Sequence, residues 1–243
     1  MQSLNFALLI YKSGTMVFSS SLFILYFLPA FLLLYYISPH RLRNYAALLA
    51  SMFFYAWGAP DFIFIVVLSI IIDFYLVKLM FAAPSRRLKR TYTAASIVMN
   101  VGLLAYFKYA NFFIENVDAI LMAMGSQPVE WTKVALPIGI SFFTFQKMTY
   151  TIDVYRGMHP PLKRVTDLAL YILMFPQLIA GPIVRFNEVA GQINERRWNE
   201  TADNRITGFF RFTIGLARKV LIANPLGAYA DSVFAADVAQ LDT

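Results

Sequence analysis

The sequence contains no cysteine and only two histidines, His40 and His159, among its 243 residues. The absence of cysteine excludes a disulfide framework, a thiolate metal site and a catalytic thiol. Two histidines are too few for a histidine-rich metal cluster, so no metal site is expected. Charge is also scarce, because Asp, Glu, Lys and Arg make up 14% of the chain, compared with about 25% in soluble domains.

Apolar residues dominate instead, at 59% of the chain with a mean hydropathy of +0.58. They form runs close to the roughly 20 residues that cross a bilayer as a helix. The net charge is +7, but the Lys and Arg residues cluster in short segments between apolar runs, as in membrane proteins. The sequence therefore predicts an all-α polytopic transmembrane helical bundle that contacts membrane lipid, with no nucleic acid partner.

The hydropathy pattern predicts six membrane segments. Four are uninterrupted, at residues 17–37, 45–57, 62–81 and 91–114, and two interrupted segments follow between residues 135 and 182. Turns expected on one side hold nine Lys or Arg residues and those on the other hold one, which places the basic turns in the cytoplasm. Beyond Ile206 a basic amphipathic helix is expected to lie in the membrane interface. We expect residues 1–15 to be a leader or a start-site extension, and residues 16–243 to belong to one membrane domain.

Two helix breaks lie in the most informative stretch, residues 135–181. Pro137 and Gly139 precede one apolar helix, and a second break runs from Phe175 to Gly181 and Pro182. Non-helical backbone at membrane depth is tolerated only where protein buries it or where it lines a wet cavity. The pattern predicts interrupted or re-entrant helices that enclose a site inside the membrane.

A polar stripe follows the first break. Gln146, Thr149, Tyr150 and Asp153 are spaced i, i+3, i+4 and i+7, which places them on one helical face. Such a stripe is expected to line a polar tunnel or to form hydrogen bonds between helices, and the spacing alone does not distinguish these two roles.

Three further polar positions are notable. Asp73 lies near the middle of the third predicted span, where a carboxylate needs a partner. We expect Lys108 or Lys147 to pair with it, and favour a structural pair over a proton relay. Arg185 is expected either to bind an anionic donor or a lipid phosphate, or to anchor the chain in the cytoplasm.

Neither histidine has a Ser, Asp or Glu at helical spacing, so both are predicted to be surface residues. No P-loop, GxGxxG, GxSxG or HExxH motif is present.

Six ordered motifs resemble the membrane-bound O-acyltransferase (MBOAT) family, and most closely the alginate O-acetyltransferase membrane subunits. They are MVFSS from Met16, FYAWG from Phe54, PIGISFFTFQ from Pro137, DVYRG from Asp153, FPQLIAGPI from Phe175 and GLARKVLIA from Gly215. The resemblance covers the chain from Met16 onward.

This resemblance implies an enzyme of the bacterial cytoplasmic (inner) membrane that passes an acyl group through a tunnel to an acceptor at the outer face. The implied donor is acetyl-CoA or another acyl thioester, no bound cofactor is expected, and the implied partner is a periplasmic acetyltransferase protein. The candidate tunnel residues are Pro137, Gly139, Ser141, Phe145, Gln146, Thr149, Asp153, Pro176, Gln177, Gly181, Pro182 and Arg185.

The catalytic histidine of the family, in an Arg-Trp-His type motif, has no counterpart here, because Arg196-Arg197-Trp198 is followed by Asn199. The chain therefore resembles the amino-terminal part of such an enzyme and is expected to be inactive alone. Three alternatives stay open: transfer of D-alanyl or another acyl group, a transporter or flippase built on broken helices, and a non-catalytic membrane scaffold.

Overall fold

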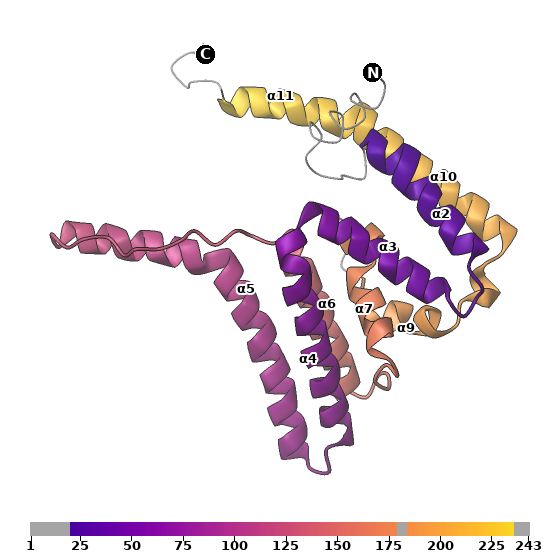
Figure 1. Ribbon diagram of the computed structural model, residues 1–243, viewed down its shortest axis with the longest axis horizontal. Coiled ribbons are helices and arrows are strands. Elements are labelled where there is room, and N and C mark those ends of the chain that lie inside the picture. The colour runs from indigo at the N-terminus through magenta and orange to yellow at the C-terminus, as the bar shows by residue number, and fades with distance from the viewer. Residues whose placement is uncertain (1–19, 179–183, 236–243) are drawn as a thin grey trace. The chain divides into compact units, whose positions relative to one another are not determined.

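The structure is a computed structural model that describes residues 20–178 and 184–235. Every regular element within these ranges is a helix (Figure 1), which confirms the all-α prediction. The chain divides into two compact units, residues 31–194 and residues 1–30 with 195–243.

The larger unit contains most of the helices. They are α3 (Arg43–Gly58), α4 (Ile63–Ala82), α5 (Arg86–Ala123), α6 (Ile140–Tyr155), α7 (Val165–Leu173), α8 (Phe175–Leu178) and α9 (Phe186–Asn194). A 3-10 turn, Pro60–Phe62, precedes α4, and α2 (Leu28–Ile37) enters the unit at its start. Helices α4, α5 and α6 pack against one another, while α7 packs on α3 and α4 (Figure 1).

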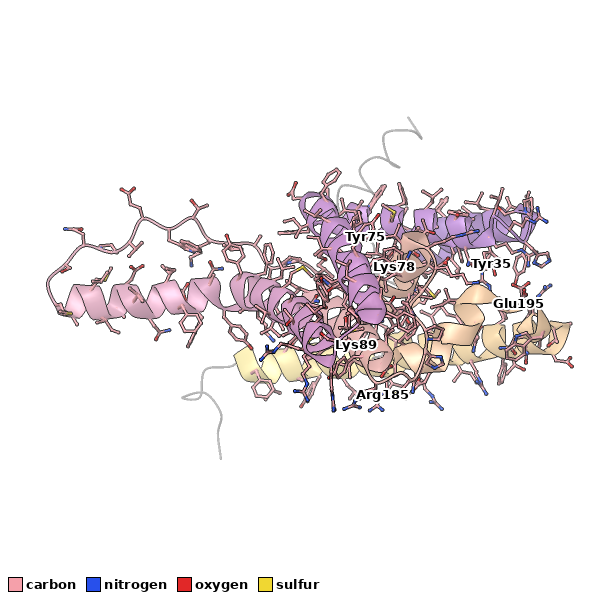
Figure 2. The ribbon with its side chains drawn as sticks, turned by 90° about the horizontal axis from the view of Figure 1, so that it is seen from below. Tyr35, Tyr75, Lys78, Lys89, Arg185 and Glu195 are labelled. Atoms are coloured by element: carbon pink, nitrogen blue, oxygen red, sulfur yellow. The ribbon has the colours of Figure 1, made fainter. Side chains whose placement is uncertain are left out.

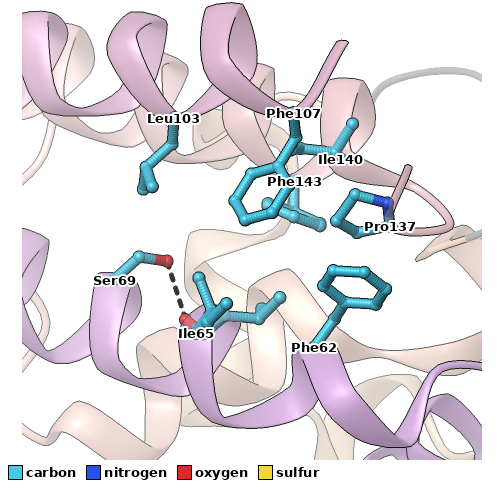
Figure 3. Close-up of a pocket in the computed structure, with 9 residues that line it drawn as sticks. Phe62, Ile65, Ser69, Leu103, Phe107, Pro137, Ile140 and Phe143 are labelled. Carbon is cyan, nitrogen blue, oxygen red and sulfur yellow. Dashed lines mark hydrogen bonds between the residues drawn. The ribbon is translucent and has the colours of Figure 1, made fainter. Parts of the chain in front are cut away.

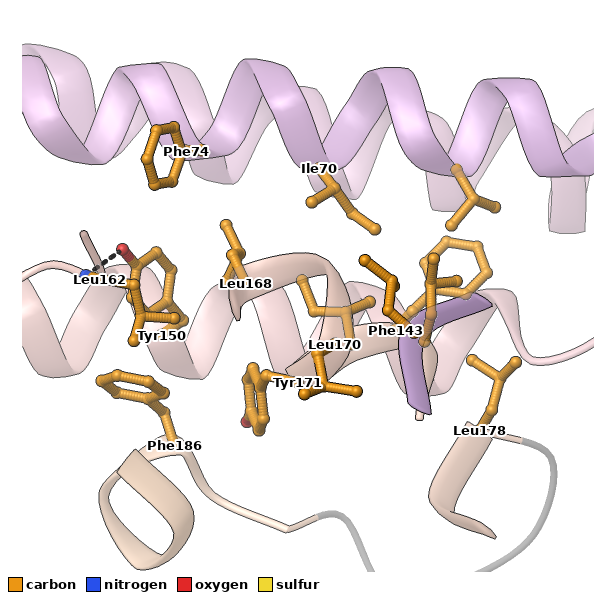
Figure 4. Packing of buried hydrophobic residues seen from close by; sticks show 14 of the residues in the cluster. Ile70, Phe74, Phe143, Tyr150, Leu162, Leu168, Leu170, Tyr171, Leu178 and Phe186 are labelled. Atoms are coloured by element: carbon orange, nitrogen blue, oxygen red, sulfur yellow. Dashed lines mark hydrogen bonds between the residues drawn. The ribbon is translucent and has the colours of Figure 1, made fainter. Parts of the chain in front are cut away.

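The core of this unit forms where α4, α6 and α7 meet. Leu168, Leu170 and Ile172 on α7 are fully buried, and Ile70 and Phe74 on α4 lie among the same buried cluster (Figure 4). Since α7 is only nine residues long, its burial rather than its intrinsic helical stability holds it in place.

The smaller unit contains the basic amphipathic helix that was predicted beyond Ile206. Its helices are α10 (Ala202–Arg218), the π-helical turn Lys219–Ala223 and α11 (Asn224–Ala235), with Phe23–Phe27 leading into α2 and a 3-10 turn at Arg197–Asn199. The side chain of Thr201 caps α10 by accepting a hydrogen bond from the amide of Asn204 at 3.2 Å. The helix predicted beyond Ile206 is therefore confirmed, and it begins four residues earlier, at Ala202.

Two helices in the described residues are long and apolar enough to cross a membrane, Pro60–Ala82 and Arg86–Ala123. The first matches the predicted span at 62–81. The apolar helix Phe23–Ile37 is shorter, and α3 and α6 have 16 residues each. The multi-pass arrangement of six segments stays a prediction.

The predictions on either side of the fourth span are wrong in part. Residues 84–91 were predicted to form a basic turn and residues 115–133 a loop, but α5 runs without interruption from Arg86 to Ala123, so only the part of the predicted loop after Ala123 is non-helical. The Ser85 side chain caps its start by accepting from the amide of Leu88 at 3.3 Å, and the first helix-breaking residue after it is Gly125, at φ 79°. Hydropathy shows which part of a helix suits lipid, whereas capping and glycine determine where the helix begins and ends.

Candidate functional site

The two predicted helix breaks meet in space. Gly139 adopts φ 78°, a left-handed conformation that side chains disfavour, and α6 begins at the next residue. A Cβ atom at this position would lie 2.7 Å from the carbonyl oxygen of Leu178, in α8. Glycine is therefore required both for its backbone conformation and for the close approach of the second break.

The second break separates α7 from α8 at Met174. The Phe175 amide donates to the Ser51 hydroxyl of α3 at 3.2 Å, and the Gln177 side-chain amide donates to the carbonyl oxygen of Tyr171. Both contacts satisfy backbone groups that the helix break leaves without helical partners. Pro176 is exposed, while Gly181 and Pro182 lie outside the described residues.

The polar stripe of α6 faces α7 and α9. The Tyr150 ring packs edge-on against Phe186 with centroids 4.8 Å apart, and its hydroxyl accepts from the Leu162 amide at 3.1 Å (Figure 4). Thr149 lies 3.4 Å from the Tyr171 hydroxyl, which donates to the carbonyl oxygen of Val184. Thr149 thus contacts α7 and Tyr150 holds the loop that follows α6, so these two residues have the structural role that the sequence left open.

The other two members of the stripe are not fully paired. Gln146 and Asp153 are buried, at 1% and 9% exposure. Within the described part of the chain, the Gln146 Oε1 and Asp153 Oδ2 atoms have no hydrogen-bond partner. Buried acceptors of this kind are normally paired with protein, water or a bound group. The stripe therefore combines structural hydrogen bonds with acceptors that are available to a ligand or to water.

The adjacent face of α6 holds a buried ion pair. Lys147 Nζ lies 3.5 Å from Asp73 Oδ2 on α4, and both side chains are almost completely buried. The predicted pairing of Asp73 with Lys147 is confirmed, and Lys108, the other candidate, lies instead over the Tyr109 ring at 5.5 Å.

A set of hydrogen bonds surrounds this pair, and within the described residues Asn100 Oδ1 is the one buried acceptor of the set that has no partner. Asp73 accepts from the Ser96 hydroxyl at 2.6 Å and from the Asn100 side chain at 2.7 Å, both on α5. Lys147 donates to Ser69 at 2.9 Å, and Ser96 lies 3.0 Å from the Thr151 hydroxyl. Each charge is therefore compensated, which is the condition for tolerating an ion pair in an apolar interior.

Sequence reasoning overlooked Ser69, Ser96, Asn100 and Thr151. Their spacing could have identified them, because Ser96 and Asn100 are four residues apart on α5 and Lys147 and Thr151 are four apart on α6. Polar residues at this spacing share one helical face. A polar face on α5 and another on α6 would both be expected to pack toward the buried Asp73 of α4, and together they would form one cluster between the three helices.

Three predicted tunnel residues do not lie with the stripe. Phe145 is 44% exposed and Ser141 is half-buried, and the two are four residues apart on a different face of α6 from Gln146. Arg185, which precedes α9, is exposed. The described structure thus brings Gln146, Thr149 and Asp153 together and places these three elsewhere.

A small apolar recess lies beside the first break, between α4, α5 and α6. Pro137 lines it together with Phe62, Phe107 and Phe143 (Figure 3). Ser69 is its polar lining residue, and this hydroxyl donates to the Val66 carbonyl oxygen at 2.7 Å while accepting from Lys147. The recess suits a methyl or methylene group better than a charged group.

Both histidines were predicted to be surface residues. His40 is exposed, as predicted, whereas His159 is half-buried with its ring 5.8 Å from that of Phe186. No group of three or more potential metal ligands occurs in the described ranges.

Comparison with known proteins gives close relatives. The chain is 42% identical to the alginate O-acetylase AlgI of Pseudomonas aeruginosa over 221 residues, which is 90% of this chain and 42% of the relative. It is 41% identical to AlgI of Azotobacter vinelandii, over 90% of this chain and 44% of that protein. A peptidoglycan O-acetyltransferase of Helicobacter pylori is 32% identical over 90% of this chain and 46% of its own length.

The chain spans less than half the length of these curated relatives. No protein-family model matches it, and no solved structure does.

Proposed function

Because this chain belongs to the alginate O-acetylase branch of the membrane-bound O-acyltransferase (MBOAT) family, we propose that it forms part of an enzyme that O-acetylates a polysaccharide of the bacterial cell envelope. The supporting observation is the identity of about 41% over 90% of the chain to proteins named as alginate O-acetylases. The more distant relative is named for a different polymer, peptidoglycan. The names share O-acetyl transfer and differ in acceptor, so the proposal specifies the reaction and leaves the polymer open.

The proposed donor is acetyl-CoA or another acetyl thioester on the cytoplasmic side of the inner membrane. In the reaction, a hydroxyl of the acceptor or of a carrier group attacks the acetyl carbonyl. A carbon–oxygen bond forms, the carbon–sulfur bond breaks, and the thiol leaves with the proton. A base promotes this attack, and exclusion of water protects the thioester from hydrolysis. A periplasmic acetyltransferase protein is the proposed partner at the outer face.

The role of this chain is to build the passage that the acetyl group follows. The two helix breaks meet where Gly139 approaches Leu178, at the start of the helix that carries the stripe. The free acceptors on Gln146 and Asp153 favour N–H and O–H donors, such as the amides of a pantetheine arm, a hydroxyl or water. The catalytic base is proposed to lie outside residues 1–243, so these residues alone are expected not to transfer acetyl groups.

The test is acetyl transfer in membranes by the complete enzyme, with the Asp153→Asn variant compared with Met148→Leu. Asp153→Asn keeps the size of the side chain and changes its charge and hydrogen bonding, whereas Met148 lies half-buried on another face of α6 and its replacement conserves volume. We expect Asp153→Asn to lower polymer acetylation roughly tenfold or more, because positioning errors at such sites are costly, and Met148→Leu to leave it unchanged. Normal acetylation by Asp153→Asn, at equal protein levels, would support the scaffold alternative.

A further inference from the structure

The second half of α5 forms an arm that leaves the helical bundle. Phe107 is the last α5 residue in the buried core of the larger unit. Beyond it, α5 continues to Ala123, and the chain returns beside it as an extended segment, residues 126–138 (Figures 1 and 2). The arm is defined here as residues 109–138, of which residues 115–133 were predicted to be a loop.

Helix length shows that α5 cannot lie entirely within the hydrocarbon core. Its 38 residues extend about 57 Å at 1.5 Å per residue, while the hydrocarbon core of a bilayer is about 30 Å thick. The basic cluster that ends at Arg90 marks one membrane surface. From there to Lys108 the helix rises about 27 Å, so the arm begins where the opposite surface is reached. Figure 1 shows that α5 changes direction along its length.

One face of the arm helix is polar and holds the returning segment. The Asn111 side chain accepts from the Val134 amide at 2.9 Å and from Trp131 Nε1 at 3.0 Å. Glu115 forms an ion pair with Lys133 at 3.1 Å, and Asp118 accepts from the Val129 amide at 2.8 Å. These three acceptors are spaced i, i+4 and i+7, on one helical face. The Glu115 and Lys133 side chains are 61% and 79% exposed, as expected for groups that contact water.

The opposite face is exposed and mostly apolar, with Asn116 as a polar residue whose side chain donates to the Phe112 carbonyl oxygen at 2.7 Å. Its apolar residues share helical spacing and are each at least 42% exposed: Tyr109, Phe112, Phe113, Val117, Ile120 and Met124. This face continues directly from the membrane-spanning part of α5, of which only 6% is buried within the protein. The surface that contacts lipid along the span therefore continues onto the arm.

We propose that the arm lies in the membrane interface at the end of the α5 span, with its apolar face in the lipid and its hydrogen-bonded polar face in water. A helix with an aromatic-rich apolar face and a charged face binds at this depth. Trp131 also fits this position, because tryptophan is enriched at membrane interfaces. The occupant of the apolar face is the bilayer, not a protein segment.

Residues 1–243 contain no cysteine, so an introduced cysteine is the one labelling site among them, and any cysteine elsewhere in the intact protein would be replaced by serine. Ile120→Cys and Met122→Cys place a nitroxide on opposite sides of one helical turn, because positions two apart are separated by about 200°. The intact protein would be labelled in vesicles of phosphatidylethanolamine and phosphatidylglycerol. For each nitroxide label, the rate of collision with oxygen would be compared with the rate of collision with a water-soluble nickel chelate. Oxygen concentrates in lipid and the chelate stays in water, so the ratio of the two rates shows which of them the label contacts. A second pair, Phe113→Cys and Glu130→Cys, provides an independent test if one variant fails to insert.

We expect the labels at Ile120 and Phe113 to collide several-fold more with oxygen than with the nickel chelate, and those at Met122 and Glu130 to show the reverse. Equal access of the chelate to both members of each pair would overturn the proposal by placing the whole arm in water. Shielding of Ile120 and Phe113 from both reagents would also overturn it, because protein would then cover the apolar face.

Discussion

Helix α6 presents two polar sets on neighbouring faces, and they differ in how completely they are paired. Toward α4 and α5, Lys147 and Thr151 join a network in which each charge has a partner. Toward α7 and α9, Gln146 and Asp153 are equally enclosed but retain acceptor atoms without a partner in the described residues. The first network compensates both of its charges and leaves one neutral acceptor, Asn100 Oδ1, without a partner in the described residues. The second set leaves an amide oxygen and a carboxylate oxygen without partners, and such buried acceptors indicate a place for water or a ligand. We therefore propose a structural role for the first set and a role in the proposed acetyl transfer for the second.

The largest effect is expected from breaking the ion pair on one side. Lys147→Met leaves Asp73 as a buried charge without its cation, which costs about 3–5 kcal/mol. We expect this variant to lose most of its folded protein in membranes, measured as the fraction that survives heating in detergent. The double variant Lys147→Met with Asp73→Asn removes both charges and should recover most of that fraction. A double variant less stable than the single one would contradict the structural role of the pair.

A smaller effect is expected where the two helix breaks meet. Gly139→Ala and Gly157→Ala both force alanine into a left-handed conformation, at φ 78° and 75°, for about 1–2 kcal/mol. Only at residue 139 does the new Cβ also meet backbone, 2.7 Å from the Leu178 oxygen. Thermal stability should therefore fall further for Gly139→Ala, and polymer acetylation should fall only for that variant. Equal losses from both substitutions would mean that the contact between α6 and α8 has no functional role.

Removing one neutral hydrogen bond from the paired set should have a modest effect. Thr151→Val deletes the contact to Ser96 at 3.0 Å while keeping the shape of the side chain, for about 1 kcal/mol. The measurement is the thermal midpoint together with acetyl transfer per unit of folded protein. We expect a lower midpoint and unchanged transfer, and a loss of specific transfer would show that the network does more than stabilise.

The smallest effect is expected on the arm. The ion pair between Glu115 and Lys133 is largely exposed, and such pairs contribute about 0–1 kcal/mol. Lys133→Gln should leave both the thermal midpoint and acetyl transfer within error of the parent protein. A marked loss of stability would show that this pair is enclosed by another part of the protein.

The first helix break and the buried ion pair could be predicted from the sequence, because each depends on the residue type at one or two positions. Pro137 and Gly139 fix a break whatever surrounds them, and a carboxylate at the position of Asp73 requires a cation within a helix diameter. The full length of α5 did not follow, because hydropathy falls near residue 114 while no helix breaker occurs before Gly125.

The orientation of individual side chains also required the structure. Ser141 and Phe145 belong to the same motif as Gln146, but they lie on another face of α6, since packing against α7 and α9 decides which face is enclosed. Sequence spacing identifies residues that share a face and does not identify the neighbour that the face contacts. Gly181 and Pro182 lie outside the described residues, so their predicted role stays a prediction.

The most direct measurement compares Gln146→Leu with Thr151→Val in the complete enzyme, as acetyl transfer per unit of folded protein. The two positions lie on one helix, are almost completely buried, and differ in whether their polar atoms are paired. The account predicts that Gln146→Leu keeps the thermal midpoint and loses roughly tenfold or more in transfer, while Thr151→Val does the opposite. Normal transfer by Gln146→Leu would contradict the assignment of the unpaired stripe to the path of the acetyl group.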